Sequence, residues 1–371
     1  MSFSDIRCLL ILVLTSWLVG CDRQPKDGLG TANLPDSSRY EGQFQGGLFH
    51  GQGKLQWRHG GYYEGEFTHG LIEGEGVFIH PDGAREEGHF VNGQLDGKGK
   101  RRTPDGAFYE GEFDNGELHG KGVFKNDREY YHGDWVNGRK SGQGSYIKQG
   151  MGEYKGQFYD DEIAGVGVLN YEDGVRIEGQ FDRGAPQGKA VVTSPGGGRL
   201  EANFVKGRAL GPGTQTTENG GQYVGEFVAG KWHGKGQFTD AEGNIYRGEF
   251  KEGLRDGYGK ILYADGREFH GNFADDLPHG QGSIEYPSSA RYAGAFEQGL
   301  PHGEGVYEFP NRDRYVGEFA GGLFEGQGTL IFAPESGKAP VSGIWHRGEY
   351  VGQPTQAPQP TAGDPIRILV K

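Results

Sequence analysis

The sequence predicts an all-β fold, an elongated single-layer antiparallel β-meander of tandem β-hairpins. Three observations lead to this prediction: a 23-residue period, an alternation of aromatic or glycine residues with polar residues, and turn-forming Asn-Gly and Asp-Gly pairs. The composition agrees with a periodic fold. The 371 residues include 72 glycines, which without a period would indicate disorder, but 12% of the residues are aromatic, and disordered segments are poor in aromatic residues.

The N-terminus predicts a signal peptide. Residues 8–20 read CLLILVLTSWLVG, an apolar run that follows Arg7 and is too short to cross a bilayer as a mature helix. The run ends in Leu18-Val19-Gly20-Cys21, which resembles the lipobox of bacterial lipoproteins. That resemblance implies cleavage after residues 1–20 and a lipid anchor on Cys21. The alternative is an ordinary secretory signal with a chance cysteine.

Charge and cysteine content limit the classes of partner that this protein can bind, and the residue after Cys21 indicates its location in the cell. Cys8 would leave with the signal and Cys21 would be acylated, so no thiol remains for a disulfide or a metal. The formal net charge of -13 disfavours nucleic acid and anionic lipid as main partners. Asp22 resembles an inner-membrane retention signal of enteric lipoproteins. We therefore expect a lipid-anchored protein of the bacterial cell membrane that faces the periplasm or the outer side, with the inner membrane favoured.

After a polar segment, 21–39, which is predicted to be a flexible linker, a 23-residue period begins. Numbering Tyr109 as position 1, position 5 is Phe or Trp and position 12 is Gly in all thirteen full copies. Positions 3 and 14 are Gly in twelve copies each, with Ala202 and Ala190 as the exceptions. A partial copy follows from Val341. The full copies start at Tyr40, Tyr63, Glu86, Tyr109, Tyr131, Tyr154, Ile177, Leu200, Tyr223, Tyr246, Phe269, Tyr292 and Tyr315; the one step of 22 residues lies between Tyr109 and Tyr131.

Each copy reads as a β-hairpin. Period-two alternation places positions 1, 3, 5, 12, 14 and 16 on one face of a sheet, so rings and glycines share that face. Asn-Gly at 92–93, 115–116 and 137–138 suits a first turn that needs positive φ angles, and Asp161 and Asp276 tolerate the same conformation. Asp-Gly pairs at 82–83, 105–106, 173–174 and 265–266 mark a second turn.

The pattern YEGEFxNGxxHGxG resembles the MORN repeat (membrane occupation and recognition nexus) over roughly residues 40–352. The resemblance implies a twisted antiparallel β-meander that acts as a scaffold, a dimerisation module or a peptide-binding groove; family members are also linked to phospholipids. Ile177 and Leu200 depart from the leading aromatic residue, and the stretch 194–198 reads SPGGG. A weaker joint around 177–222 is one interpretation of these departures, and ordinary repeat drift is the other.

Residue patterns of catalysis are missing from the sequence. No Gly-Lys pair precedes Ser or Thr, and G-x-G-x-x-G, H-E-x-x-H and G-x-S-x-G do not occur. Glutamates at position 4 are predicted to form a solvated outer face. Histidines at position 11 would lie about 9.6 Å apart in adjacent hairpins, too far for shared metal ligation, and are predicted to be turn or ring-edge residues. These histidines are His50, His119, His233, His279 and His302. We predict no catalytic residues, metal or cofactor.

The aromatic stripe is the candidate binding face, because exposed apolar stripes mark interaction sites. The alternative is that the stripe forms only the core. The candidate residues are Tyr40, Phe44, Tyr63, Phe67, Tyr109, Phe113, Tyr131, Trp135, Tyr223, Phe227, Tyr246, Phe250, Tyr292, Phe296, Tyr315 and Phe319.

The predicted function is a non-enzymatic, membrane-tethered scaffold or protein- and peptide-binding module of the bacterial cell envelope. Its partner would be an unidentified envelope protein or peptide, and a homodimer is possible. The alternative is a peripheral protein that binds phospholipid or cell-wall glycan, since rings also stack on sugars. The repeats are followed by a Pro-rich tail, 353–371, whose segment Ile366–Val370 is hypothesised to pair with a sheet edge or to lie in the aromatic groove.

Overall fold

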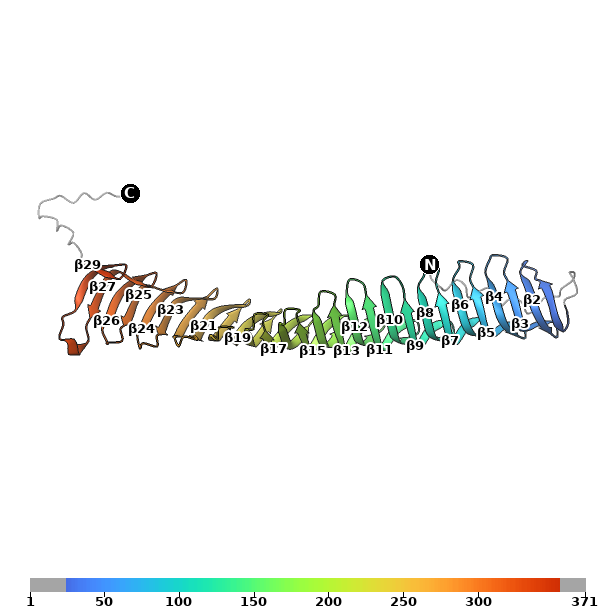
Figure 1. Ribbon diagram of the computed structural model, residues 1–371, viewed down its shortest axis with the longest axis horizontal. Helices are drawn as coiled ribbons and strands as arrows, with labels where there is room; N and C mark the ends of the chain where they lie inside the picture. Colours follow the sequence, from blue (N-terminus) through green and yellow to red (C-terminus); the bar gives the residue numbers. More distant parts are fainter. Residues whose placement is uncertain (1–24, 354–371) are drawn as a thin grey trace, which may run out of the picture. The chain divides into compact units, whose positions relative to one another are not determined.

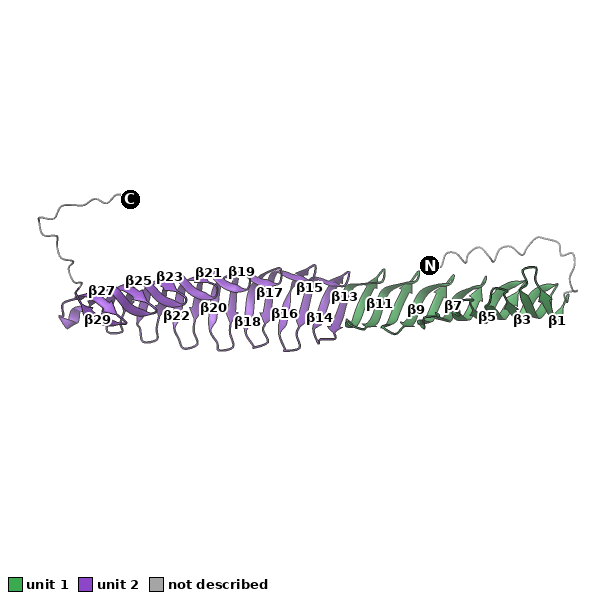
Figure 2. Ribbon diagram, turned by 90° about the horizontal axis from the view of Figure 1, so that it is seen from above, with its two compact units in different colours: residues 1–165 green, residues 166–371 purple. Residues whose placement is uncertain are grey.

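The structure, a computed structural model, describes residues 25–353 and divides into two compact units, residues 1–165 and 166–371 (Figure 2). The predicted signal peptide, Cys21, Asp22 and the tail after 353 lie outside the described residues. Strands that follow one another in the chain pair antiparallel within each unit (Figure 1). The all-β antiparallel meander is therefore confirmed.

Between residues 25 and 165, the described part of the first unit, there are twelve complete strands. They are β1 (Gly28–Asn33), β2 (Arg39–Gln45), β3 (Leu48–Gln56), β4 (Tyr62–Thr68), β5 (Leu71–Ile79), β6 (Arg85–Val91), β7 (Gln94–Arg102), β8 (Phe108–Asp114), β9 (Glu117–Lys125), β10 (Glu129–Val136), β11 (Arg139–Lys148) and β12 (Gly152–Tyr159). Strand β13 (Glu162–Tyr171) begins in this unit and ends in the second.

The second unit continues the same alternation of strands. They are β14 (Arg176–Asp182), β15 (Ala185–Thr193), β16 (Arg199–Val205), β17 (Arg208–Thr216), β18 (Gln222–Val228), β19 (Lys231–Thr239), β20 (Ile245–Lys251), β21 (Leu254–Leu262), β22 (Glu268–Ala274), β23 (Leu277–Glu285), β24 (Arg291–Glu297), β25 (Leu300–Glu308), β26 (Arg314–Ala320), β27 (Leu323–Ile331), β28 (Val341–His346) and β29 (Glu349–Gly352). A 3-10 turn, η2 (Pro334–Ser336), precedes β28.

Strand β1 is a difference from the prediction, which assigned residues 21–39 to a flexible linker. Gly30 lies opposite Gly42 and Ala32 opposite Tyr40, so β1 extends the sheet by the second half of a copy that lacks its first half. The sequence does contain the repeat pattern for this strand, because Gly28 precedes Gly51 by the same 23 residues that separate full copies. A half-copy was missed because the pattern was aligned on its leading aromatic residue.

Both predicted turns form, and the first turn also joins neighbouring hairpins. Positions 7 and 8 have positive φ angles, 49° at Asn115 and 78° at Gly116, as a type I′ turn requires. Asp161 and Asp276 adopt φ angles of 70° and 69°, as predicted. The position-8 N–H donates to the position-10 carbonyl of the preceding copy, for example Gly116 to Leu95 at 2.8 Å.

The one copy of 22 residues differs from the others in the length of its second turn. In most copies the N–H of position 18 donates to the carbonyl four residues later, as Thr103 does to Ala107 at 2.9 Å. In the 22-residue copy, Asn126 instead donates to Glu129, three residues later, at 2.9 Å. The deletion therefore shortens a turn and leaves the strand register intact.

Glycines at positions 3 and 14 form a row across the strands, with Gly111 opposite Gly122 and Gly122 opposite Gly133. The row gives room to the position-1 tyrosines, because a Cβ atom on Gly122 would lie 2.3 Å from the Tyr109 hydroxyl. The two exceptions, Ala190 and Ala202, face each other. They belong to the copies that begin with Ile177 and Leu200, where no tyrosine ring needs the space.

Position 12 is invariant for a different reason. All thirteen of these glycines have positive φ, such as 59° at Gly120. Gly120 lies at a β-bulge next to the pair Glu112–His119, where position 4 is opposite position 11. The position-4 side chain turns back over this bulge. Asp134 accepts a hydrogen bond from the Gln143 backbone N–H at 2.9 Å, and Glu66 from Glu75 at 3.4 Å. The predicted solvated acids therefore also stabilise the bulge.

The core is a ladder of aromatic rings. Tyr131 contacts Trp135 of its own copy at 5.1 Å and Phe158 of the next copy at 5.1 Å, both edge to face. The same geometry recurs in the second unit, where Tyr246 lies between Phe250 and Phe273. Edge-to-face contacts at this distance are favourable for aromatic pairs. Each hairpin thus completes its core with a ring from its neighbour, as expected for a repeat array.

The predicted weak joint around 177–222 stays a prediction. Strands β14 to β18 pair without interruption, including the hairpin β16–β17 that begins near Leu200. Residues 194–198 form part of a turn in which Ser194 donates to Gly198 at 2.8 Å, equivalent to the second turn of other copies. The unusual residues therefore occupy ordinary places in the repeat.

Candidate functional site

All sixteen residues of the predicted binding face lie on one face of the sheet, and all are buried. Their exposed fractions run from 0% at Tyr40, Tyr63, Tyr131, Tyr223, Tyr292 and Tyr315 to 4% at Phe44, Phe113, Trp135 and Phe296. The sequence placed them correctly in space, but side chains this deeply buried offer little area to a partner. The structure assigns them to the core, and direct partner contact by these rings stays a prediction that their burial argues against.

A second layer of side chains covers the tyrosines and remains partly accessible. At position 10, Phe49 stacks on Tyr40 with ring centroids 3.8 Å apart, and Phe324 stacks on Tyr315 at 3.9 Å. Trp232 covers Tyr223 in the same way at 4.5 Å. These three covering rings are half-buried. In these three copies the accessible surface of the aromatic face is therefore made by position 10, which was not among the predicted site residues.

Two covering residues are cations instead of rings. The Arg255 guanidinium lies 5.7 Å from the ring centroids of both Tyr246 and Phe273, and Lys140 Nζ lies 5.7 Å from Tyr131. Both distances fit a cation–π contact. Arg255 also donates to the Asp276 carboxylate at 3.1 Å and to its carbonyl oxygen at 2.6 Å. The second layer thus carries fixed charge as well as aromatic surface.

A cavity of about 190 Å³ opens in this layer in the second unit. Trp232 and Phe238 supply aromatic walls, and Arg255, Asp276 and Asn244 supply polar groups. The Trp232 indole N–H donates to Gln215 Oε1 at 2.8 Å, which fixes the ring. The cavity thus combines aromatic walls with oriented polar groups.

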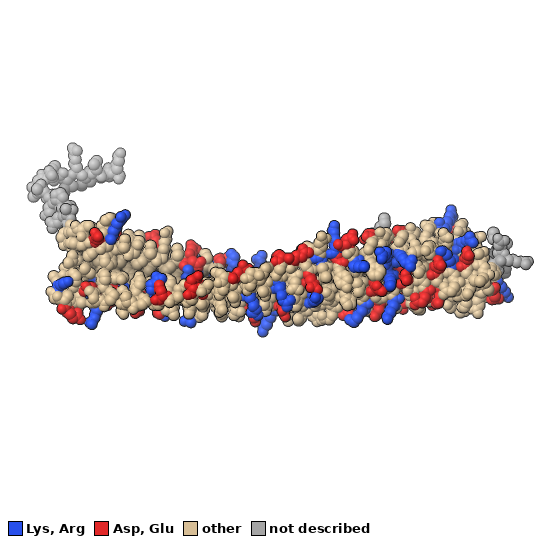
Figure 3. Space-filling view, viewed as in Figure 1, with Lys and Arg blue, Asp and Glu red and all other residues tan. Residues whose placement is uncertain are grey.

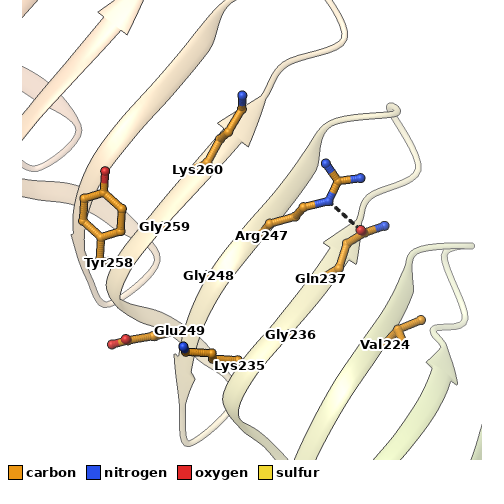
Figure 4. A pocket seen from close by; sticks show the side chains of 10 residues that line it. All are labelled: Val224, Lys235, Gly236, Gln237, Arg247, Gly248, Glu249, Tyr258, Gly259 and Lys260. Carbon is orange, nitrogen blue, oxygen red and sulfur yellow. Dashed lines mark hydrogen bonds between the residues drawn. The ribbon is translucent and has the colours of Figure 1, made fainter.

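A larger groove, of about 540 Å³, lies over strands β18 to β21 (Figure 4). Its lining side chains occupy positions 2, 4, 13 and 15, which alternate with the ring positions and so lie on the opposite face of the sheet. Figure 4 shows Arg247 joined to Gln237 by a hydrogen bond, with Lys260 on the neighbouring strand. No feature of the aromatic pattern pointed to this groove.

Burial changes the acidity of the core tyrosines. Burial raises the pKa of Tyr109 to about 12. Its hydroxyl donates a hydrogen bond to the Glu112 carbonyl oxygen at 3.0 Å. Burial also raises the pKa of the equivalent Tyr246 to about 12. A phenol held neutral to this pH is a structural group and not a general acid or base near neutrality.

Glu86 occupies position 1, where ten of the other twelve full copies have an aromatic residue, and is 8% exposed. Its Oε1 accepts from Arg101 Nε at 2.7 Å, and its Oε2 lies 3.3 Å from His80 Nε2. Burial opposes its ionisation, but the hydrogen bond from His80 and the charge of Arg101 outweigh burial and lower the pKa of Glu86. The carboxylate is thus a paired structural ion.

The position-11 histidines do not assemble a metal site. Among residues 25–353, no group of three His, Cys, Asp or Glu side chains could hold a metal ion. His50, His119 and His233 are half-buried, and their Nδ1 atoms are buried without a hydrogen-bond partner. The carbonyl of His119 lies 3.5 Å from the Tyr109 hydroxyl, which places this histidine at the edge of the ring ladder.

The surface charge is mixed on the face that Figure 3 displays, where Lys and Arg side chains are interspersed with Asp and Glu. Within the part of the chain that the structure describes, no helix qualifies as a candidate membrane span. The net charge of -13 therefore coexists with local basic surface such as the groove of Figure 4.

The family model of the MORN repeat matches more than half of the chain, so this chain belongs to the MORN-repeat family. The matched segments are 40–62, 63–85, 87–108, 109–126, 131–149, 154–176, 178–199, 223–245, 246–266, 269–291, 292–314 and 315–336. The copy at 200–222 is outside them, although its hairpin β16–β17 has the usual register. No curated protein matches this sequence.

Several solved structures resemble the chain at low identity. The TCP domain of SAS-4 from Drosophila melanogaster, solved with a proline-rich motif of Ana2, is 10% identical with a TM-score of 0.27, covering 48% of this chain and 88% of that one. The TCP10 domain of CPAP from Danio rerio, solved with a STIL peptide, is 10% identical with a TM-score of 0.23, covering 86% and 100%. These scores carry no argument about function.

Proposed function

We propose that the chain is a non-enzymatic scaffold of the bacterial cell envelope that binds segments of partner proteins and is tethered to the membrane through Cys21. The observation that carries the binding role is the second layer of the aromatic face. Its rings are accessible, fixed by stacking on buried tyrosines, and interrupted by the cavity between Trp232 and Arg255. Rigid aromatic anchors beside a few oriented polar groups are the usual composition of a protein-binding surface.

The binding role is tested by site-specific photo-crosslinking in the producing cells. A photoreactive phenylalanine analogue at Trp232 keeps an aromatic ring over Tyr223, and the same analogue at Tyr159, which is 76% exposed in the first unit, serves as the control. We expect a discrete protein adduct from position 232 and none from position 159. Adducts only to lipid or glycan, or identical adducts at both positions, would overturn the proposal.

Self-association is separated from partner binding by sedimentation velocity with light scattering on residues 22–371. A monomer at all concentrations leaves the aromatic surface free for another protein. A concentration-dependent dimer makes the chain its own partner, and a scaffold built from copies of this chain follows. The acyl-free protein is also sedimented with liposomes and with cell-wall glycan, because retention there would support the peripheral lipid- or glycan-binding alternative.

The tether is tested with the full chain. Cys21→Ala should block incorporation of a fatty-acid label and release the protein from the membrane fraction, while Cys8→Ala should change neither. Membrane retention of the Cys21→Ala protein with its signal uncleaved would need a second check, by N-terminal sequencing, to separate a failed export step from a signal that acts as an anchor. A cleaved, unlabelled and soluble wild-type protein would contradict the tether.

A further inference from the structure

The groove of Figure 4 has an unusual charge arrangement for this sheet. In the first unit, the position-15 residues Lys54 and Lys100 lie directly opposite acids at position 2 of their own copies, Glu41 and Glu87. On their other side they form ion pairs with position 2 of the next copy, Lys54 with Glu64 at 2.9 Å and Lys100 with Glu110 at 3.3 Å. In the groove, position 2 is Arg247 and position 15 is Lys260, and these two cations are directly opposite each other. Like charges at directly opposed sites are unfavourable in a sheet.

The chain neutralises only one member of this pair from within. Arg247 Nε donates to the neutral Gln237 Oε1 at 2.7 Å, while Lys260 Nζ lies 2.5 Å from Glu268. Among the described residues, neither Arg247 nor Lys235 makes an ion pair with an acid within 4.0 Å. Glu249 is the one acid that lines the groove. Lys235 is directly opposite Glu249, and Lys260 is paired with Glu268. Within the described part of the chain, Arg247 is therefore the one cation of the groove without a matching acid, in a protein whose net charge is -13.

Apolar side chains border the cations. Val224 is 55% exposed and Tyr258 is 59% exposed, and both line the groove, on opposite sides of the view in Figure 4. The exposed ring can cover an apolar side chain of a ligand while Arg247 binds its carboxylate. The volume of about 540 Å³ lies in the range of ligand sites in proteins.

We propose that this groove binds a short acidic segment of a partner protein, with a carboxylate paired to Arg247 and an apolar side chain against Tyr258. The guanidinium of Arg247 matches a planar carboxylate with two parallel hydrogen bonds. Nucleic acid and anionic membranes carry charge far beyond the groove, and the acidic chain around it repels them, whereas a short segment meets only the groove. This inference rests on the proposed protein-binding function and names a partner class for the second face of the sheet.

The test uses residues 22–371 and fluorescence anisotropy with a labelled peptide of alternating Glu and Leu. We expect saturable binding that weakens with salt, and no binding of the matched peptide in which Gln replaces Glu. Arg247→Glu restores the acid that unit 1 has at this position, so the variant keeps a familiar cross-strand pair and should fold. It should weaken peptide binding about tenfold or more, since a lost charge pair and a new repulsion both act.

The matched control is Lys98→Glu, which makes the same charge change at position 13, the place that Lys235 holds in its own copy. It should change affinity less than about twofold. Equal affinity of wild type and Arg247→Glu, or equal binding of the Gln peptide, overturns the inference. So does binding of phosphatidylglycerol vesicles or inorganic phosphate that depends on Arg247 when the Glu peptide does not bind. Adducts at position 232 that persist in Arg247→Glu would leave the scaffold proposal standing while this inference fails.

Discussion

The hydroxyl of Tyr109 lies over the backbone of Gly122, so close that a Cβ atom on that glycine would be 2.3 Å away. This contact explains why a glycine at position 14 accompanies a tyrosine at position 1. Gly122→Ala should therefore lower the free energy of unfolding by about 1–3 kcal/mol, the usual cost of overpacking, measured by urea denaturation. Gly99→Ala is the matched control, because its copy begins with Glu86 and the nearest atom, Leu95 Cδ2, is 3.0 Å from the added Cβ. Equal losses would contradict this explanation.

Position 12 is expected to require glycine because of its positive φ angle, and not because an added side chain would clash with a neighbour. Gly97 has φ of +84° and nothing within 4 Å of an added Cβ. Gly97→Ala should cost roughly 1–2 kcal/mol from left-handed backbone strain. Gly97→Asn should cost less, because asparagine tolerates this conformation better. Urea denaturation of both variants measures the difference, and an alanine variant as stable as wild type would show that the bulge can relax.

Alkaline pH should unfold the protein cooperatively. Burial raises the pKa of eight core tyrosines to about 12 from a usual 10.0, so between these values the unfolded chain has lost protons that the folded chain keeps. Their stabilising contribution is complete below pH 10 and is lost as pH rises towards 12. Circular dichroism and phenolate absorbance should change together. The eight residues are Tyr40, Tyr63, Tyr109, Tyr154, Tyr223, Tyr246, Tyr292 and Tyr315.

Tyr292→Phe is the control for this pH dependence, because Phe269 already occupies position 1 in the preceding copy and is 1% exposed. Removing one buried phenol should reduce the alkaline slope of the unfolding free energy by up to about 1.4 kcal/mol per pH unit. An unchanged slope would mean that the phenols ionise without unfolding.

The Glu86–Arg101 pair should behave as a single unit. Glu86→Gln leaves Arg101 without its carboxylate and should cost roughly 3 kcal/mol, the lower end for a buried ion pair, since the Arg101 side chain is 23% exposed. The double variant Glu86→Tyr/Arg101→Phe recreates the Tyr109–Phe124 pair of the next copy and should recover most of the loss. A double-mutant cycle built from Glu86→Tyr, Arg101→Phe and the double variant, followed by urea denaturation, measures the coupling, and additive effects would contradict it.

The Glu86 carboxylate should also make the free energy of unfolding depend on pH in the acid range. Because the pKa of Glu86 is lowered in the folded protein, its stabilising effect is present above its usual value of 4.5 and is lost as pH falls through the folded value. The double variant should lack this part of the acid dependence. Stability measured between neutral pH and the acid limit checks the sign.

Deleting β1 tests whether residues 28–33 form a strand that stabilises the sheet or belong to a flexible linker. Deleting residues 22–33 from the soluble chain should reduce amide protection in β2 and expose Tyr40, whose neighbour across the strand pair is Ala32. Hydrogen exchange followed by mass spectrometry measures this loss. Unchanged protection of β2 would support the linker that the sequence predicted.

The ring positions and turns were predictable because they depend on local periodicity. Tyr109 and Phe113 alternate with charged residues, and Asn115-Gly116 needs positive φ whatever its neighbours do. Burial of the rings was not predictable from one hairpin, because Tyr131 is covered by Phe158 of the next copy and by residues at position 10. The choice between a binding face and a core therefore stayed open at the level of the sequence.

The groove and the ion pair depend on which residues face each other across strands. Arg247 and Lys260 are thirteen residues apart, and their opposition follows only from the bulge-shifted register. Glu86 stood out in the repeat alignment as a departure, but its partner Arg101, fifteen residues later, was overlooked although position 16 is apolar in many copies. The opposed cations and the ion pair both become visible when repeat positions that face each other across strands are compared two at a time.

The ring ladder has a consequence for how such a chain can change in evolution. Each tyrosine contacts rings only of its own copy and of an adjacent one, as Tyr246 does with Phe250 and Phe273. Recombination that removes or duplicates one whole copy would therefore join surfaces that already fit, and no new interface has to be selected. A partial deletion would instead interrupt the glycine row. The number of hairpins can thus vary in the genome faster than the sequence of any one of them, and the spacing between binding surfaces varies with it.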